Sequence, residues 1–193
     1  MFWLVSVLLG WSYFKATNDL AVLALWVLAV FLSILLHEFG HVLMGQFFGS
    51  SGFIILHGFG GLAVGSSDLS NRWKRIAVTL AGPGIQLVLW GILQGIIHAS
   101  LVPDNPKIRI FILMLSNINL FWPLLNLIPV YPLDGGQVLL DSLTYFSANG
   151  RKQAFGISVA AGIGAAIYFG NSGQLFLVFL FVLLIMQNLE LVR

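Results

Sequence analysis

The sequence has 193 residues, of which 59% are hydrophobic and only 8% are charged, and its mean hydropathy is +0.96. Soluble domains carry about 25% charged residues, so the composition excludes most soluble classes and predicts a surface that faces lipid. Nine Lys and Arg against seven Asp and Glu give a formal net charge of +2, without the basic run typical of a nucleic-acid-binding protein.

Long apolar segments alternate with short polar breaks, and each sufficiently long segment predicts a transmembrane helix. Six spans are predicted, at residues 1–14, 20–48, 76–97, 108–128, 154–169 and 175–192. The first is short for a bilayer core of about 30 Å. It also lacks a basic start and a cleavage site, so we interpret it as a retained span rather than a signal peptide. The apolar segment at 138–145 is too short to span.

The distribution of Lys and Arg predicts the orientation of these spans. If six spans alternate, one side of the membrane receives Arg72, Lys74, Arg75, Arg151, Lys152 and Arg193, and the other receives Lys15, Lys107 and Arg109. The side with more positive charge is expected to be cytoplasmic, which places both termini in the cytoplasm. A prokaryotic plasma membrane is the expected location for so small a chain.

The second apolar segment contains His37-Glu38-Phe39-Gly40-His41, an H-E-x-x-H motif. On a helix, His37 and His41 project from the same face and can bind one zinc ion. Glu38 can take a proton from the water that zinc activates. Ionisable residues inside a membrane segment are costly and usually mark function. A metal site is therefore favoured over incidental polar residues.

Two imidazoles leave a catalytic zinc site one protein ligand short of the usual three. Cysteine is absent, so the candidates are His57, His98 and a carboxylate. Asp134 stands out because it ends the proline-broken run N-L-I-P-V-Y-P-L-D at 126–134 and precedes two glycines, which let the backbone turn beside the carboxylate. Irregular backbone at membrane depth is tolerated mainly where it lines a cavity. The alternative is an ordinary polar loop in which Asp134 caps a helix.

H-E-F-G-H in an early span, followed by N-L-I-P-V-Y-P-L-D-G-G, resembles the site-2 protease family of intramembrane zinc metalloproteases. The resemblance covers about residues 32–140. It implies an all-α polytopic fold that forms one membrane-embedded domain over 1–193. Its three-helix catalytic core would occupy about 20–147.

The resemblance implies that His37, His41 and Asp134 are the zinc ligands and that Glu38 is the general base. It also implies that Asn126 holds the substrate or the oxyanion. An equally open alternative is that Asn126 only caps the broken backbone.

The run His57-Gly-Phe-Gly60-Gly61-Leu resembles the family's small membrane-associated β-hairpin loop. An exposed strand edge could hold an opened substrate segment by β-augmentation, with Gly60 and Gly61 as substrate-binding positions. A flexible connector is the alternative. Ala-Gly-Pro-Gly at 81–84 also fits the family's pattern and is interpreted as close helix packing with a kink at Pro83.

The resemblance further implies hydrolysis of peptide bonds within or beside transmembrane segments of substrate proteins, as in regulated intramembrane proteolysis. The expected partners are the lipid bilayer and a transmembrane protein substrate, and nucleic acid is not expected. The chain has no room for a PDZ or CBS domain, so a separate regulatory membrane protein is a candidate partner. The alternative function is a divalent-metal transporter or metal-binding membrane protein. A transporter would line a path with ligands on several spans, whereas the ionisable residues here concentrate at one site.

Overall fold

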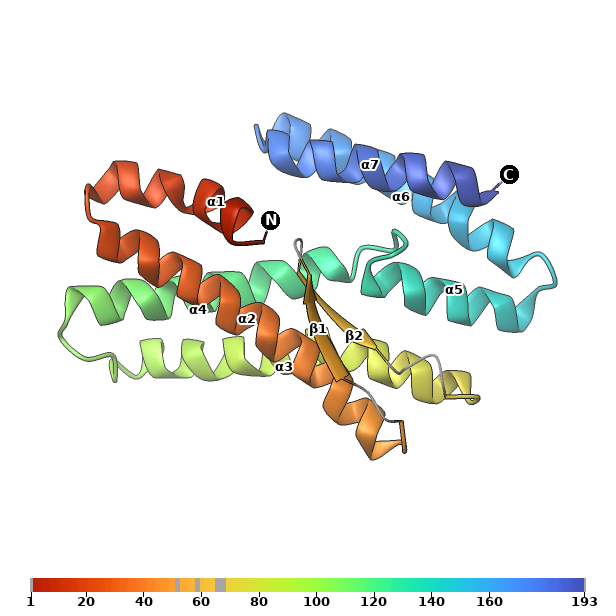
Figure 1. The fold of residues 1–193 in the computed structure, drawn as a ribbon, viewed down its shortest axis with the longest axis horizontal. Coiled ribbons are helices and arrows are strands. Elements are labelled where there is room, and N and C mark those ends of the chain that lie inside the picture. The colour runs from red at the N-terminus through yellow and green to blue at the C-terminus, as the bar shows by residue number, and fades with distance from the viewer. Residues whose placement is uncertain (1, 51–52, 58–59, 65–68, 193) are drawn as a thin grey trace. The chain divides into compact units, whose positions relative to one another are not determined.

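The computed structural model describes residues 2–50, 53–57, 60–64 and 69–192 (Figure 1). The described part is helical, with one two-stranded sheet. In chain order the elements are α1 (Phe2–Thr17), α2 (Leu20–Phe47), β1 (Phe53–His57), β2 (Gly60–Val64), α3 (Arg72–His98), α4 (Pro106–Asn126), α5 (Asp134–Phe146), α6 (Gly150–Asn171) and α7 (Leu175–Val192).

Five of the described helices, α2, α3, α4, α6 and α7, are long and apolar enough to cross a membrane. Helix α1 has 16 residues and α5 has 13, and both are shorter than the candidate spans, which have 18 to 28 residues. The span predicted at residues 1–14, which corresponds to α1, therefore stays a prediction. Large apolar side chains are exposed on the spanning helices, as at Val88 (63%) and Phe179 (61%), which suits contact with lipid. The chain is an integral membrane protein with several spans.

Short polar side chains cap the N-termini of three of the spanning helices. Asp19, Asn71 and Asn105 each accept a hydrogen bond from the backbone N–H two residues further on, at 2.8, 3.0 and 3.0 Å. Each bond satisfies one of the backbone donors that lack a partner within the first turn of a helix. These caps allow α3 and α4 to begin before the apolar segments do.

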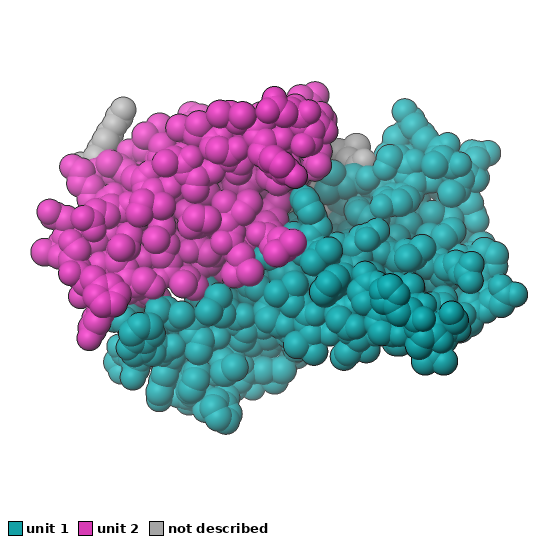
Figure 2. Space-filling view, turned by 180° about the vertical axis from the view of Figure 1, so that it is seen from behind, with its two compact units in different colours: residues 1–123 teal, residues 124–193 magenta. Residues whose placement is uncertain are grey.

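The chain divides into two compact units, Met1–Pro123 and Leu124–Arg193 (Figure 2). In the first unit, α2 packs against α1 and α3, and a buried apolar cluster joins α2 to α4 through Val22, Ala29, Met114 and Ile118. In the second unit, α6 packs against α5 and α7, around a core that contains Leu125, Val130, Phe169, Phe181 and Leu184.

Strands β1 and β2 pair antiparallel where the sequence predicts a hairpin. The register runs from Phe53 opposite Val64 to His57 opposite Gly60, and both strands contact α2. Gly61 lies opposite Leu56. Residues 58–59 of the expected glycine-rich turn lie outside the described residues.

Candidate metal centre

Helix α2 places the three motif side chains in the protein interior. His37, Glu38 and His41 are 4%, 7% and 8% exposed. The spacing of four residues puts both imidazoles on one face of the helix, with ring centroids 4.6 Å apart. The two Nε2 atoms lie 3.0 Å apart. The motif therefore forms a compact pair of imidazole donors, as its spacing predicts.

Hydrogen bonds at the Nδ1 atoms define the tautomer of each ring. His41 Nδ1 lies 2.8 Å from the Val78 carbonyl oxygen, and because a carbonyl only accepts, this Nδ1 carries the proton. The amide of Gln86 donates through Nε2 to the Ser33 carbonyl oxygen at 3.0 Å. That bond orients the amide so that Oε1 faces His37 Nδ1 at 2.9 Å. His37 Nδ1 is therefore also the donor.

When both rings are neutral, protons on the two Nδ1 atoms leave a lone pair on each Nε2, and these atoms face each other across 3.0 Å. Two facing lone pairs repel, so a cation between them stabilises this arrangement. Two zinc–nitrogen bonds of about 2.0–2.1 Å can span such a separation. Donation from the other ring nitrogen to an oxygen is also the usual environment of a zinc-bound histidine. The histidine pair fits a zinc ion.

Asp134 is the first residue of α5 and is 7% exposed. The residue that caps α5 is Leu133, and it makes no side-chain capping hydrogen bond, so the alternative in which Asp134 caps the helix is not supported. Gly135 and Gly136 follow in the first turn. A Cβ at either would clash with the backbone of 127–128 or 130–131. These glycines therefore allow the first turn of α5 to pack closely against the preceding backbone. The sequence predicted only that they let the backbone turn beside Asp134.

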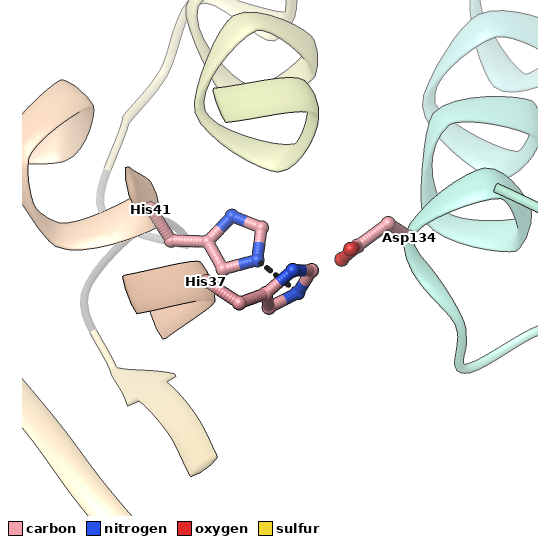
Figure 3. A group of neighbouring side chains, drawn as sticks. All are labelled: His37, His41 and Asp134. Carbon is pink, nitrogen blue, oxygen red and sulfur yellow. Dashed lines mark hydrogen bonds between the residues drawn. The ribbon is translucent and has the colours of Figure 1, made fainter. Parts of the chain in front are cut away.

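His37, His41 and Asp134 form a group of buried potential metal ligands (Figure 3). One ligand atom from each residue lies within 4.8 Å of the other two. Two imidazoles and one carboxylate supply the three protein ligands that are usual in catalytic zinc sites. The donor set implies zinc.

Gly82 on α3 lies directly against the His41 ring. A Cβ at this position would clash with the Nε2 and Cε1 atoms of the imidazole. At Gly40 on α2, a Cβ would come within 2.5 Å of the Ala81 carbonyl oxygen, which shows how closely α2 and α3 pack. The sequence predicted only packing for residues 81–84, and the structure shows that Gly82 packs directly against the imidazole of His41.

The other residues considered from the sequence lie in α4, β1, β2 and α3. Asn126 is the half-buried last residue of α4, and Gly60 and Gly61 lie in β2. Their roles in substrate binding stay predictions. His98 is exposed at the end of α3 and is not in the ligand group that the described residues form. The side chain of His57 is outside the described part of the chain.

Gln86 is a residue of this site that the sequence prediction missed. It is fully buried, at 0% exposure, and accepts from His37. The available signal was an amide side chain in the middle of the apolar segment at 76–97, because polar groups inside membrane segments are costly and often functional.

The fold and the buried ligand group define an integral membrane protein with a candidate zinc centre. No family model matches the sequence. A relative in Synechocystis sp., named "Putative zinc metalloprotease sll0528", is 36% identical over 154 residues, which is 77% of this chain and 39% of the relative. The chain thus spans about two fifths of that relative's length.

A solved structure described as "Site-2 Protease from Methanocaldococcus jannaschii" has the same fold. It matches with a TM-score of 0.69 at 22% sequence identity, over 99% of this chain and 88% of that one. This match confirms the fold that the resemblance to the site-2 protease family implies.

Proposed function

We propose that this protein is an intramembrane zinc metalloprotease that hydrolyses peptide bonds within or beside transmembrane segments of other proteins. The observation that carries the proposal is the buried group of His37, His41 and Asp134, with Glu38 buried beside the first histidine. The fold shared with a site-2 protease supports it, as does the 36% identical relative.

Each residue of the site has one role in this proposal. His37 and His41 bind zinc through Nε2, and Asp134 binds it through a carboxylate oxygen. When bound, zinc supplies a Lewis acid that polarises the scissile carbonyl and lowers the pKa of water. Glu38 accepts the proton of the attacking water and passes it to the leaving amine. Burial of these side chains in α2 and α5 restricts bulk water at the reacting atoms.

The β1–β2 pair is the proposed binding surface for an opened substrate segment. A transmembrane helix satisfies its backbone amides internally, so its scissile peptide bond must leave the helix before water can attack it. An antiparallel pair with an unpaired edge can take up such a segment as an additional strand. Gly60 and Gly61 in β2 leave space for its backbone, and Asn126 is the proposed donor to the substrate or the oxyanion.

The proposed location is the plasma membrane of a prokaryote, with both termini in the cytoplasm. Lys and Arg gather at the ends of α3 and α6 that face this side in a six-span arrangement, which agrees with the positive-inside rule. The transmembrane substrate and a separate regulatory membrane protein are the proposed partners.

A metal transporter would use the same ligands but predicts different behaviour. The test compares zinc content of purified protein with zinc flux into proteoliposomes, for the wild type and Glu38→Gln. The protease proposal predicts about one tightly held zinc per chain in both proteins and no flux in either. Zinc flux that disappears in His37→Ala would support the transporter and overturn the proposal.

A further inference from the structure

Hydrogen bonds among buried polar residues of the unit Met1–Pro123 connect Asn119, Ser33 and Gln86 to His37. Gln86 and Asn119 are 0% exposed and Ser33 is 1% exposed. Asn119 Nδ2 donates to Ser33 Oγ at 2.9 Å, Gln86 Nε2 donates to the Ser33 carbonyl oxygen at 3.0 Å, and His37 Nδ1 donates to Gln86 Oε1 at 2.9 Å. These hydrogen bonds link helices α4, α2 and α3.

The hydrogen bonds fix which end of the Gln86 amide faces the histidine. A backbone carbonyl can only accept, so the bond to Ser33 requires the NH₂ group on that side. The carbonyl oxygen of the amide is then left for His37. Burying an amide among apolar side chains is costly unless it is hydrogen-bonded, and Gln86 makes one bond through each end of its amide. An apolar side chain of similar size would avoid that cost, but it could not accept from His37.

The two histidines differ in what holds them. His41 Nδ1 donates to the backbone carbonyl of Val78, which no side-chain substitution removes. His37 Nδ1 is held by a side chain. The orientation of one ligand is therefore built into the backbone of α3, whereas the orientation of the other depends on the identity of residue 86.

We infer that Gln86 is a positioning residue for the metal: it holds His37 in the tautomer that presents Nε2, and the backbone carbonyl of Ser33 in turn orients the Gln86 amide. This inference rests on the proposed zinc site. Without an acceptor at position 86, the His37 ring can turn or carry its proton on Nε2, where it cannot bind a metal. Loss of an outer hydrogen-bond partner of a zinc-bound histidine typically lowers metal affinity about 10–100-fold.

The test measures zinc affinity of the full chain in detergent, by competition with a chromophoric chelator. Gln86→Leu removes the acceptor with little change in size, and Gln86→Glu keeps an acceptor for His37. Gln94→Leu is the matched control, because Gln94 is half-buried on the same helix. We expect affinity to fall about 10–100-fold for Gln86→Leu, to stay unchanged for Gln94→Leu, and to be tighter in Gln86→Glu than in Gln86→Leu.

A second readout reports the ligand geometry directly. In cobalt-substituted protein, the visible absorption bands of the metal should change shape in Gln86→Leu and stay as in the wild type in Gln94→Leu. If Gln86→Leu does not fold, Gln86→Asn replaces it, because it keeps a buried amide that is too short to reach both partners.

The outcomes separate this inference from the proposed function. A wild type that binds no zinc would overturn both. A wild type that binds zinc, with equal affinity and an unchanged cobalt spectrum in a folded Gln86→Leu or Gln86→Asn variant, would overturn only the role of Gln86.

Discussion

The Nε2 atoms of His37 and His41 lie 3.0 Å apart, on rings whose Nδ1 atoms each donate to an oxygen acceptor. One helix supplies both donors, so their separation is set by the backbone of α2. A site on regular secondary structure holds its ligands more precisely than one on loops.

Removal of a metal ligand should abolish zinc binding without unfolding the chain. Asp134→Ala and His41→Ala each leave two protein ligands where about three are needed, so zinc content should fall to background. The exposed His98 at the end of α3 provides the control His98→Ala, which should keep full zinc content. Metal analysis of purified protein checks this prediction. Full zinc content in Asp134→Ala would refute the role of Asp134 as a ligand.

A methyl group at position 82 should disturb the metal site. Because a Cβ there clashes with the His41 ring, Gly82→Ala should weaken zinc affinity and destabilise the protein by about 1–3 kcal/mol, as overpacking of cores does. Gly84→Ala is the control, since a Cβ at that position meets no atom within 4 Å.

Alanine also favours helices over glycine by about 1 kcal/mol, so Gly84→Ala should be neutral or stabilising. Thermal unfolding and chelator competition measure the two effects. Equal thermal midpoints and equal zinc affinities for Gly82→Ala and Gly84→Ala would mean that the packing of Gly82 against the His41 ring does not matter for the site.

Two buried side chains hold the segment that precedes Asp134. Ser158 Oγ accepts from the Tyr131 N–H at 3.1 Å, and Asn188 Nδ2 donates to the Tyr131 carbonyl oxygen at 2.6 Å. Asn188→Leu should destabilise the protein by about 0.6 kcal/mol, the average measured for side-chain hydrogen bonds in a membrane protein, and by about 1.7 kcal/mol at most. It should also weaken zinc affinity, because Tyr131 lies close to Asp134 in the chain.

The neighbouring residue on α7 gives a matched control for this prediction. Gln187 is exposed, so Gln187→Leu should change neither the thermal midpoint nor the zinc affinity. If Asn188→Leu were as stable as Gln187→Leu and bound zinc equally well, these hydrogen bonds would not support the site.

Asp19 should make a small, pH-dependent contribution to stability. The backbone N–H of Ala21, first, and the Lys107 ammonium, 3.3 Å away, hold the pKa of Asp19 below its ordinary value of 3.8. A carboxylate with a lowered pKa contributes stability that is full above pH 3.8 and is lost as the pH falls through the lower, folded-state pKa. Because the pair is exposed, the effect should be small.

The variant Asp19→Asn isolates the charge, because asparagine also caps helices but does not ionise. The thermal midpoint of the wild type should exceed that of Asp19→Asn at neutral pH, and the difference should vanish in acid. A difference that is the same at neutral and acid pH would contradict this assignment of the charge.

The helices were predictable from sequence because lipid requires long apolar segments. The predicted span at 175–192 coincides with α7, and the one at 20–48 agrees with α2 to within one residue. Helix α3 begins at Arg72, before the apolar segment at 76–97. A prediction from hydropathy leaves the charged segment 72–75 out of the span. In the structure this segment is helical, because Asn71 caps the helix before it.

The site was predictable in part, for reasons of chain distance. His37 and His41 are four residues apart on one helix, so periodicity alone predicts that they share a face. Asp134 was found through its proline-broken motif. Gln86 was not predicted because its bond to His37 joins residues 49 positions apart. In sequence, Gln86 also looks no different from Ser33 or Asn119, which lie in apolar segments as well.

The most direct test of the central claim compares membrane-protein fragments in cells that contain the wild type with those in cells that contain Glu38→Gln. This substitution keeps the shape of the side chain and the zinc ligands, but it removes the proposed base. Quantitative mass spectrometry should find fragments cut within or beside transmembrane segments in the wild type, with intact substrates accumulating in Glu38→Gln. The same fragments at the same abundance in both cells would contradict proteolysis by this site.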